Sequence, residues 1–379
     1  MALAIFKLGK SYYKKKKIAL VYEKNSNYAQ DNGFYFFSHC MKHKIQRRLN
    51  ANIYYVIQRN SKDYSNVKKY SQNVLEFMSL KHMVYSLASR LLISSESRSN
   101  SYIWRPNNSP IARSIRDKKL FSLRRGVTGL KRIDGIYNKF NPHHPDMIVA
   151  SSEKEKEILI KNLNYSPGDV CITGLARWDG LEDKSMNSKE ILYVPAMRNW
   201  LEDVDDETFL ESDYYNSYIQ LLRSEELQNI LEKNDLTLNF FNNTRLKDYI
   251  SKISVRNPRI NILTIDDTQL NNLIMSCKVF ITDYSSVCWD VLYLNKPVLF
   301  YQFDYEKYKN TTGSYIDMER DLPGDRSTSI NGLCDNLQRL INSDFRMSYK
   351  YQLKRNLSFR YFDKNNCVRL VQEIRKMKW

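Results

Sequence analysis

The stretch that decides the fold class is ITDYSSVCWDVLYLNKPVLFY, residues 281–301. An apolar run ends at Asp283, a helical pattern starts with Ser285 and Ser286, and a second apolar run follows. Strand, helix and strand in this order predict a parallel βαβ unit. Because parallel sheets bind ligands at the carboxyl ends of their strands, we expect these side chains at a binding edge, with the two serines cradling phosphate. The alternative is that Ser285 only caps the helix.

The same alternation extends through the chain. In the first half it predicts strands at 18–22, 53–57, 74–77, 91–94, 147–151 and 169–173, and helices at 33–43, 80–89 and 153–163. In the second half it predicts strands at 191–194, 236–240, 260–265, 279–282 and 297–301, and helices at 214–232, 245–253, 268–277 and 285–294. Two such blocks predict an α/β protein with two Rossmann-like domains facing across a cleft, the GT-B-like architecture.

Length and composition exclude several classes of protein. A chain of 379 residues exceeds the size of one hydrophobic core, and 42% hydrophobic with 27% charged residues is typical of globular proteins. No uncharged apolar run approaches the length of a membrane span. The N-terminal lysines follow a short apolar patch, which reverses the order of a signal peptide, so we expect a cytoplasmic protein.

The charge balance indicates anionic partners. Lys plus Arg number 59 against 42 Asp plus Glu, a formal net charge of +17. The first 17 residues combine lysines with Phe6, Tyr12 and Tyr13 and contain no acid. This pattern suits peripheral docking on an anionic membrane surface, and a solvated basic tail is the open alternative. Nucleic acid is not expected, because the motifs of its common binding modules are missing.

No cofactor or metal is expected. A Gly-rich dinucleotide fingerprint and a P-loop are both missing, and the six cysteines form no CxxC pair. The carboxylate pair Asp266 and Asp267 is interpreted as a helix cap.

Several motifs together resemble one known family. TDYSSV is followed by KPVLFYQFDYEKY and DLPG, and three earlier segments occur in matching order, namely GVTGLKRID (126–134), ITGLARWDGL (172–181) and EILYVPAMRNWLE (190–202). This set is similar to the CDP-glycerol glycerophosphotransferase family of teichoic-acid polymerases and primases, over roughly residues 19–340. The resemblance implies a GT-B enzyme that transfers a polyol phosphate from a CDP-activated donor to a lipid-linked anionic envelope polymer, of teichoic-acid or capsular type, at the inner face of the membrane.

The resemblance also implies separate roles for three parts of the chain. Residues 1–183 would form the acceptor and membrane side, residues 184–350 the nucleotide-donor domain, and residues 351–379 a C-terminal helix packing back on the first domain. The expected donor-side residues are Arg198, Asp283, Ser285, Ser286 and Asp304. Of these, Arg198 and the serines would contact the diphosphate. The acceptor-side loop contributes Gly126 and Lys131.

Two departures from the family pattern concern catalysis. Arg125 stands where the family usually has a histidine, and Asn243 falls nearest a second expected histidine. Neither side chain can take up a proton, because a guanidinium stays protonated and an amide does not titrate. A substitute base would be Asp134 or Asp146, with desolvation raising its pKa.

Three hypotheses therefore stay open. The chain is a polyol-phosphate transferase with an altered base, or a nucleotide-sugar glycosyltransferase on the same scaffold, or a degenerate homologue without activity. His143 and His144, in the loop NPHHPD, are interpreted as solvated.

Overall fold

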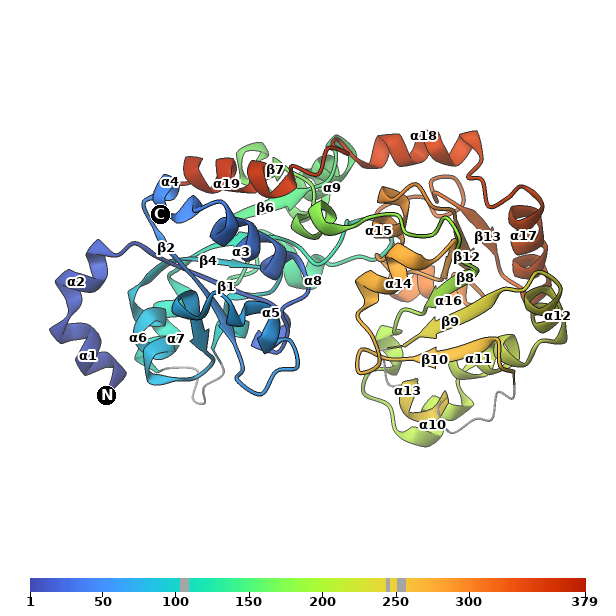
Figure 1. The fold of residues 1–379 in the computed structure, drawn as a ribbon, viewed down its shortest axis with the longest axis horizontal. Coiled ribbons are helices and arrows are strands. Elements are labelled where there is room, and N and C mark those ends of the chain that lie inside the picture. Colours follow the sequence, from blue (N-terminus) through green and yellow to red (C-terminus); the bar gives the residue numbers. More distant parts are fainter. Residues whose placement is uncertain (103–108, 243–245, 251–256) are drawn as a thin grey trace. The chain divides into compact units, whose positions relative to one another are not determined.

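The computed structural model describes residues 1–102, 109–242, 246–250 and 257–379. The chain forms two compact α/β units (Figure 1). Unit 1 contains Met1–Val127, Ile133–Gly180 and Phe359–Trp379, and unit 2 contains Thr128–Arg132 and Leu181–Ser358.

Unit 1 is built on a seven-stranded parallel sheet with the order β3-β2-β1-β4-β5-β6-β7. Its strands are β1 (Ile18–Tyr22), β2 (Asn52–Ile57), β3 (Val74–Glu76), β4 (Ser89–Ser94), β5 (Lys119–Ser122), β6 (Met147–Ala150) and β7 (Val170–Ile172). All five residues of β1, IALVY, are buried, as expected for a central strand covered on both faces. The order reverses between β1 and β4, so the carboxyl ends of these two strands mark the ligand-binding edge.

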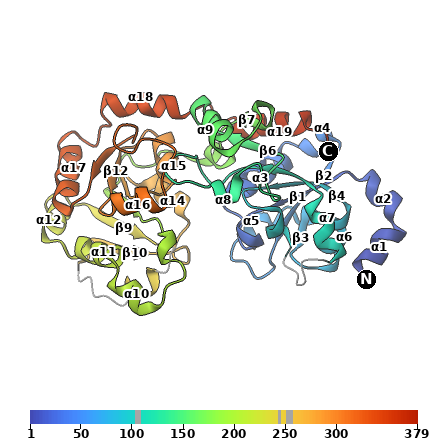
Figure 2. The ribbon, with the colours of Figure 1, turned by 180° about the vertical axis from the view of Figure 1, so that it is seen from behind.

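The helices of unit 1 cover both faces of this sheet. They are α1 (Ala2–Leu8), α2 (Lys10–Lys15), α3 (Asn32–Lys42), α4 (Ile45–Leu49), α5 (Tyr64–Lys68), α6 (Leu80–Ala88), α7 (Pro110–Arg116), α8 (Asp134–Tyr137), α9 (Glu153–Leu163) and α19 (Asn366–Lys376). Helices α1, α6 and α7 share a core with Tyr54 of β2 and lie together in Figure 2. Phe37 of α3 packs on Tyr55, and successive strand residues point to opposite faces, so α3 covers the other side.

Unit 2 has a six-stranded parallel sheet with the order β10-β9-β8-β11-β12-β13. Its strands are β8 (Glu190–Val194), β9 (Thr237–Phe241), β10 (Ile260–Leu263), β11 (Val279–Thr282), β12 (Val298–Tyr301) and β13 (Asp325–Ser327). Its helices are α10 (Asp206–Glu211), α11 (Asp213–Arg223), α12 (Glu225–Lys233), α13 (Lys247–Ile250), α14 (Leu270–Ser276), α15 (Cys288–Tyr293), α16 (Tyr305–Thr311), α17 (Ile330–Asn342) and α18 (Tyr349–Ser358). Leucines of α11, α12 and α17 share one core with the sheet. The order reverses between β8 and β11.

The predicted strands are present with small shifts at their ends, but two observed strands were missed. Strand β5 reads KLFS and β13 reads DRS, so neither carries a long apolar run. The expected helix 214–232 is two helices that meet at Ser224. Part of the expected helix 245–253 lies outside the described residues.

The observed units differ from the expected domains in three ways. The single C-terminal helix expected at 351–379 is two helices, α18 in unit 2 and α19 in unit 1. The transition after the first block falls at Gly180, three residues before the expected boundary at 183. Residues 128–132, expected in the first domain, belong to unit 2.

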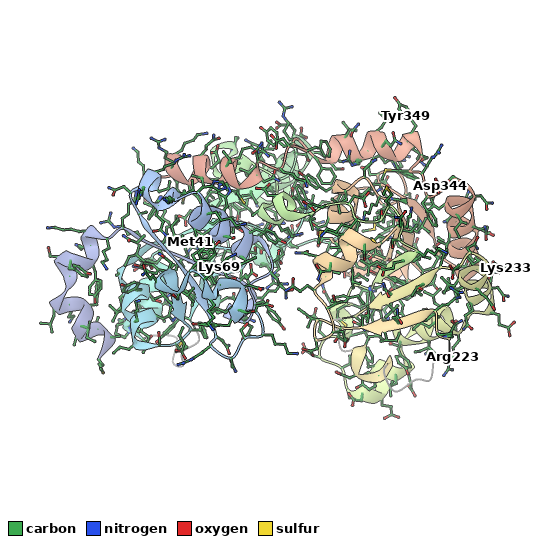
Figure 3. The ribbon with its side chains drawn as sticks, viewed as in Figure 1. Met41, Lys69, Arg223, Lys233, Asp344 and Tyr349 are labelled. Carbon is green, nitrogen blue, oxygen red and sulfur yellow. The ribbon has the colours of Figure 1, made fainter. Side chains whose placement is uncertain are left out.

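Surface features complete the description. Charged and polar side chains cover the outer faces, and Tyr349 projects from the start of α18 with 73% of its surface exposed (Figure 3). All six cysteines are buried and free. Within the described ranges, no helix is both long enough and apolar enough to cross a bilayer.

Candidate functional site

The donor edge of unit 2 is organised around Asp283, directly after β11. Its Oδ1 accepts the backbone N–H groups of Ala196 (2.9 Å) and Tyr284 (2.5 Å), and its Oδ2 accepts Arg198 Nη1 (2.7 Å) and Tyr218 Oη (2.5 Å). The carboxylate is fully buried. Four donors on one carboxylate compensate its desolvation and join the loop after β8 to the loop after β11.

Arg198 connects Asp283 to Asp304. Its Nε and Nη2 donate to Asp304 at 2.7 and 3.1 Å, and its guanidinium lies 4.7 Å from the centre of the Tyr284 ring. Tyr284 stacks on Tyr308 with 3.5 Å between ring centres and also donates to Asp304. Burial acts to lower the pKa of the arginine, but Asp283, then Tyr218 and Asp304, outweigh it and hold this pKa well above its usual value. Because Arg198 is fully buried, its expected contact with a diphosphate stays a prediction, and its observed role is to position the two aspartates.

The two serines lie in a turn before α15, not in the helix. Ser285 is half-buried, and its Oγ accepts the backbone N–H of Val287 at 3.3 Å. Val287 is the N-cap of α15 and makes no side-chain capping bond, so Ser285 caps the turn and the helix itself begins at Cys288. Ser286 is exposed, and of the five expected donor-side residues it alone is exposed.

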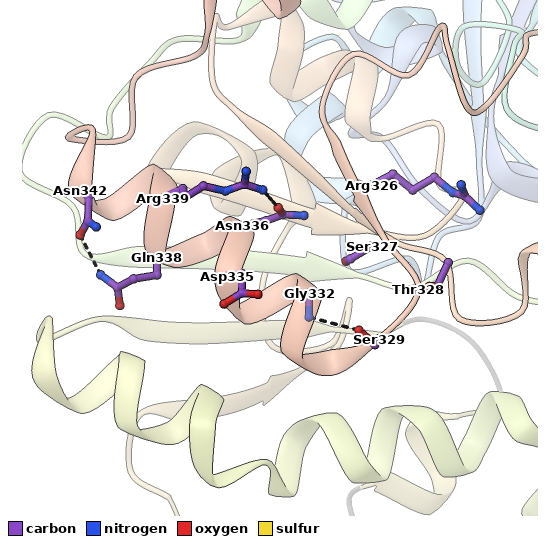
Figure 4. A pocket seen from close by; sticks show the side chains of 10 residues that line it. All are labelled: Arg326, Ser327, Thr328, Ser329, Gly332, Asp335, Asn336, Gln338, Arg339 and Asn342. Carbon is purple, nitrogen blue, oxygen red and sulfur yellow. Dashed lines mark hydrogen bonds between the residues drawn. The ribbon is translucent and has the colours of Figure 1, made fainter.

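A polar pocket of about 730 Å³ opens beside this edge, at the end of β13 (Figure 4). Arg326, Thr328 and Ser329 line it from the strand end, and α17 lines the other side along its length, from Gly332 to Asn342. Arg326 Nε donates to Gln302 at 2.9 Å, and Gln302 donates to the backbone oxygen of Asp283 at 3.0 Å. Sequence reasoning missed Arg326 because it missed β13, and its position two residues after the DLPG motif was the available signal.

Lys131, expected on the acceptor side, is part of unit 2. Its Nζ donates to Asn199 Oδ1 at 2.6 Å, and burial lowers its pKa with help from the charge of Arg198. The adjoining backbone is held by Tyr308 Oη on Leu130 O at 3.1 Å. This segment therefore places Lys131 beside the loop that carries Arg198.

The equivalent edge of unit 1 carries Arg125 and Glu96. Arg125 Nη2 lies 2.5 Å from Glu96 Oε1, with 67% of the arginine side chain exposed against 2% of the glutamate. Glu96 Oε2 accepts the backbone N–H of Asn25 at 2.8 Å. Arg124 adopts a left-handed φ of 61° and its guanidinium lies 4.4 Å from the ring centre of Tyr137. The loop thus presents Arg125 outward and holds it through a buried carboxylate, which sequence reasoning did not single out.

The segment ITGLARWDGL supports this edge through Arg177. Arg177 Nη1 donates to Arg125 O at 2.7 Å and pairs with Asp31 at 3.0 Å. Glu23, directly after β1, accepts the backbone N–H groups of Gln30, Asp31 and Phe34. Burial, and then the charge of Asp31, raise the pKa of Glu23 to about 7. Arg177 and other donors hold the pKa of Asp31 below its usual value despite burial.

The same segment anchors α19. Asp179 accepts the backbone N–H and the side-chain amide of Asn366 at 2.9 and 2.8 Å, and the backbone N–H of Cys367 at 2.8 Å. A carboxylate at a helix N-terminus satisfies free N–H groups and is favoured by the helix dipole. A Cβ on Gly174, where φ is +75°, would lie 2.2 Å from Asn366 Oδ1. The motif therefore has a structural role at α19.

The remaining expected residues are dispersed. Gly126 is buried in the loop after β5, and Asp134 begins α8. Asn243 lies outside the described residues. Asp146 is paired with Arg98 at 2.5 Å and accepts the backbone N–H of Leu120, which leaves it poorly placed as a base. In the described part of the chain, no group of three or more His, Cys, Asp or Glu side chains is arranged to hold a metal.

The chain has two α/β units, each with a parallel sheet that carries polar side chains at the point where its strand order reverses. These features define a GT-B-type protein. The wall teichoic acid polymerase TagF, in a variant with one histidine replaced by asparagine, superposes with a TM-score of 0.71 at 16% identity over 99% of this chain and 92% of that one. A putative UDP-N-acetylglucosamine 2-epimerase from Listeria monocytogenes gives a TM-score of 0.56 at 14% identity, over 96% of each chain. The GT-B fold class is thereby confirmed.

The chain belongs to the CDP-glycerol:poly(glycerophosphate) glycerophosphotransferase family, whose model matches residues 3–376. The resemblance of the motifs is thus confirmed. The minor teichoic acid biosynthesis protein GgaB of Bacillus subtilis is 27% identical over 89% of this chain and 38% of its own length. The teichoic acid glycerol-phosphate primase of the same organism is 26% identical over 63% of this chain and 59% of its own length. The chain thus spans between about two fifths and three fifths of these two relatives.

Proposed function

We propose that this protein transfers glycerol phosphate, or the phosphate of a close polyol analogue, from a CDP-activated donor to a hydroxyl of a lipid-linked envelope polymer of teichoic-acid or capsular type. The observation that carries the proposal is the Asp283, Arg198 and Asp304 network at the reversal point of unit 2, in a chain that the family model matches over residues 3–376. The names of the related primases and polymerases and a TagF structure soaked with CDPG support the donor class.

The reaction forms a bond from the acceptor oxygen to the distal phosphorus of the donor. The bond from that phosphorus to the CMP oxygen breaks, CMP leaves with the electron pair, and the acceptor proton passes to a base. Catalysis then depends on groups that hold the diphosphate as charge moves to CMP. In this proposal Ser285, Ser286 and Arg326 contact the diphosphate, and the buried aspartates fix the loops that carry them.

On the acceptor side, the exposed Arg125 attracts the anionic polymer, and the buried Gly126 follows it in the same loop. Lys131, whose lowered pKa reflects its partial burial, supports acceptor binding from unit 2. Two carboxylates are candidate bases in place of the missing histidine, Asp134 and the buried Glu96 that Arg125 covers. Asn243, as a neutral amide, would bind substrate and not titrate.

The donor assignment is tested by binding and by turnover. Ser285→Ala with Ser286→Ala should weaken CDP-glycerol binding in calorimetry, whereas the control Ser343→Ala with Ser348→Ala, also in unit 2, should not. A ligand at about one hundred times its Kd stabilises the folded state by about 2.7 kcal/mol, so the same comparison is visible in thermal unfolding. Equal affinity of the two double variants contradicts the phosphate role of the serines. Binding of UDP-sugars alone would instead identify a nucleotide-sugar transferase, and release of no CMP with acceptor present would identify a degenerate homologue.

We also propose peripheral binding at the inner face of the cell membrane through α1 and α2, consistent with a cytoplasmic protein and a lipid-linked acceptor. Ala2, Phe6 and Tyr13 belong to or pack on the core beneath α6, while Leu8 is 91% exposed among lysines. Deleting these helices would damage unit 1, so the test is Leu8→Ser with Lys10→Gln and Lys14→Gln. Flotation with phosphatidylglycerol vesicles should fall in this variant but not in Leu357→Ser, a control on α18 that is 70% exposed in the folded protein. Unchanged flotation contradicts membrane docking by α1 and α2.

A further inference from the structure

A cationic pocket lies in unit 1, away from the ends of the strands. It has a volume of about 430 Å³ and is bordered by α3, α4 and α19. Its rim carries His39, His43, Arg48, Lys364 and Arg375, and its apolar lining includes Leu49. Figure 1 shows that these three helices, far apart in the sequence, lie together in this unit. The basic residues therefore come from both ends of the chain.

Three cations of this rim lack a charged partner in the part of the chain that the structure describes. Among the described residues, Arg48, Lys364 and Arg375 form no ion pair. The neighbouring acids are already engaged, because Asp363 pairs with Arg369 at 2.8 Å and Glu373 pairs with Lys376 at 2.6 Å. A concave cluster of uncompensated positive charge attracts anions.

The one acid in the lining is Asp179. Its carboxylate oxygens accept three N–H groups at the start of α19 and are therefore engaged away from the rim cations. The ring of His39 lies 4.5 Å from that of His43. Burial, and then His43, Lys42 and Arg48, lower the pKa of His39 to about 4. A bound anion would reverse the electrostatic part of that effect, so His39 reports on occupancy of the pocket.

The shape of the pocket indicates the kind of anion. Val368, Val371, Gln372 and Arg375 line it at the spacing of one helical face, and seven residues of helix span about 10 Å. This length exceeds a single phosphate group. A concave pocket suits a discrete chain better than the flat surface of a membrane, and the apolar lining suits the carbon backbone between phosphates.

We propose that the pocket between α3, α4 and α19 binds an anionic phosphodiester chain through two or more of its phosphates. Arg48 and Arg375 are the principal contacts, since guanidinium groups pair with phosphate oxygens in a bidentate way. This site is distinct from the strand ends of unit 1 and does not depend on transfer. The proposal therefore stands or falls separately from the transferase function.

The test measures binding of a fluorescent tri(glycerol phosphate) to the full-length protein by anisotropy, without CDP-glycerol. Arg48→Gln with Arg375→Gln should weaken binding by about tenfold or more, as expected for loss of two charged contacts. The control Arg113→Gln with Arg116→Gln removes the same charge from α7, on the other face of the unit 1 sheet, and should change affinity by less than about twofold. All four arginines are exposed, so folding should be preserved, which thermal unfolding checks.

A second readout does not rely on substitution. The imidazole NMR signals of His39 should shift to a higher apparent pKa when the oligomer binds. Equal weakening by the control variant, or unshifted histidine signals at saturation, overturns the proposal. It is also overturned if inorganic phosphate competes as well as the oligomer, or if the pocket variant loses only phosphatidylglycerol vesicles and keeps the oligomer. CDP-glycerol binding should be the same in the pocket variant and the wild type.

Discussion

Replacing Arg198 by methionine should destabilise unit 2 strongly. Arg198 pairs with both Asp283 and Asp304, whose side chains are 0% and 7% exposed. Breaking a buried ion pair by removing one partner costs about 3–5 kcal/mol, because the other charge is left uncompensated. In the variant, Asp283 would still accept hydrogen bonds from three other donors, and Asp304 would still accept the hydrogen bond from the Tyr284 hydroxyl. We expect a loss within that range.

The assay is differential scanning calorimetry of the full-length protein, with urea unfolding as a second measure. For a domain of this size, 1 kcal/mol shifts Tm by about 2–4 °C, so the unit 2 transition should fall by roughly 10 °C. The matched control is Arg259→Met, since Arg259 pairs with Asp235 at 2.9 Å with 30% and 60% of the side chains exposed. An exposed pair of this kind contributes little to stability, because solvent screens the two charges.

A rescue variant separates charge from packing. Arg198→Met combined with Asp283→Asn and Asp304→Asn removes the stranded charges and should recover part of the lost stability. If Arg198→Met costs no more than the Arg259→Met control, or if the triple variant is as unstable as the single one, the account of this network as a buried charge cluster is refuted.

Three further changes have defined outcomes. Burial and the charge of Asp31 raise the pKa of Glu23 to about 7 from the usual 4.5, so its contribution to stability is complete below about pH 4.5 and is lost as pH rises to about 7. The unfolding free energy of the wild type should therefore fall over this window relative to that of Glu23→Gln. Parallel pH profiles of the two proteins in urea unfolding would contradict this. Arg125→Ala should cost less stability than Arg198→Met, since 67% of the Arg125 side chain is exposed and Glu96 keeps the backbone N–H of Asn25, yet it should reduce CMP release with acceptor present. Full activity would exclude an acceptor role. Asp179→Ala should lower the unfolding free energy by about 1.5–3 kcal/mol, because the first N–H groups of α19 lose their acceptor. The measurement is amide hydrogen exchange, which should become faster in α19 but not in the control helix α9. Unchanged exchange in α19 would show that the cap is unimportant.

The fold class was predictable because buried parallel strands have short apolar runs as their sequences. β1 and β11 match their expected bounds, and α9 was predicted to the residue. The two missed strands, β5 and β13, lack such runs, and their strand conformation depends on pairing with β4 and β12. The same omission concealed Arg326, whose place beside the donor edge follows from that pairing.

The candidate site was predictable as positions along the chain, but not as contacts. The motifs located Asp283, Arg198 and Asp304 after β11, β8 and β12, which the periodicity and the resemblance together indicated. The burial of Arg198 between the two aspartates required three loops to converge at one sheet edge, and convergence depends on strand order, which local sequence does not encode.

The sequence alone thus determined the α/β class, the family and the order of the motifs, because these depend on local hydrophobic patterning and residue identity. Only the tertiary structure decided which groups share an environment. Residues 128–132 joined unit 2 through contacts such as Tyr308 with Leu130, separated by 178 positions in the chain. Likewise α19 joined unit 1 because Asp179 satisfies its first N–H groups, and the cationic pocket exists because that helix lies beside α3. Such contacts between distant positions decide burial and charge compensation, and therefore which side chains are available for binding.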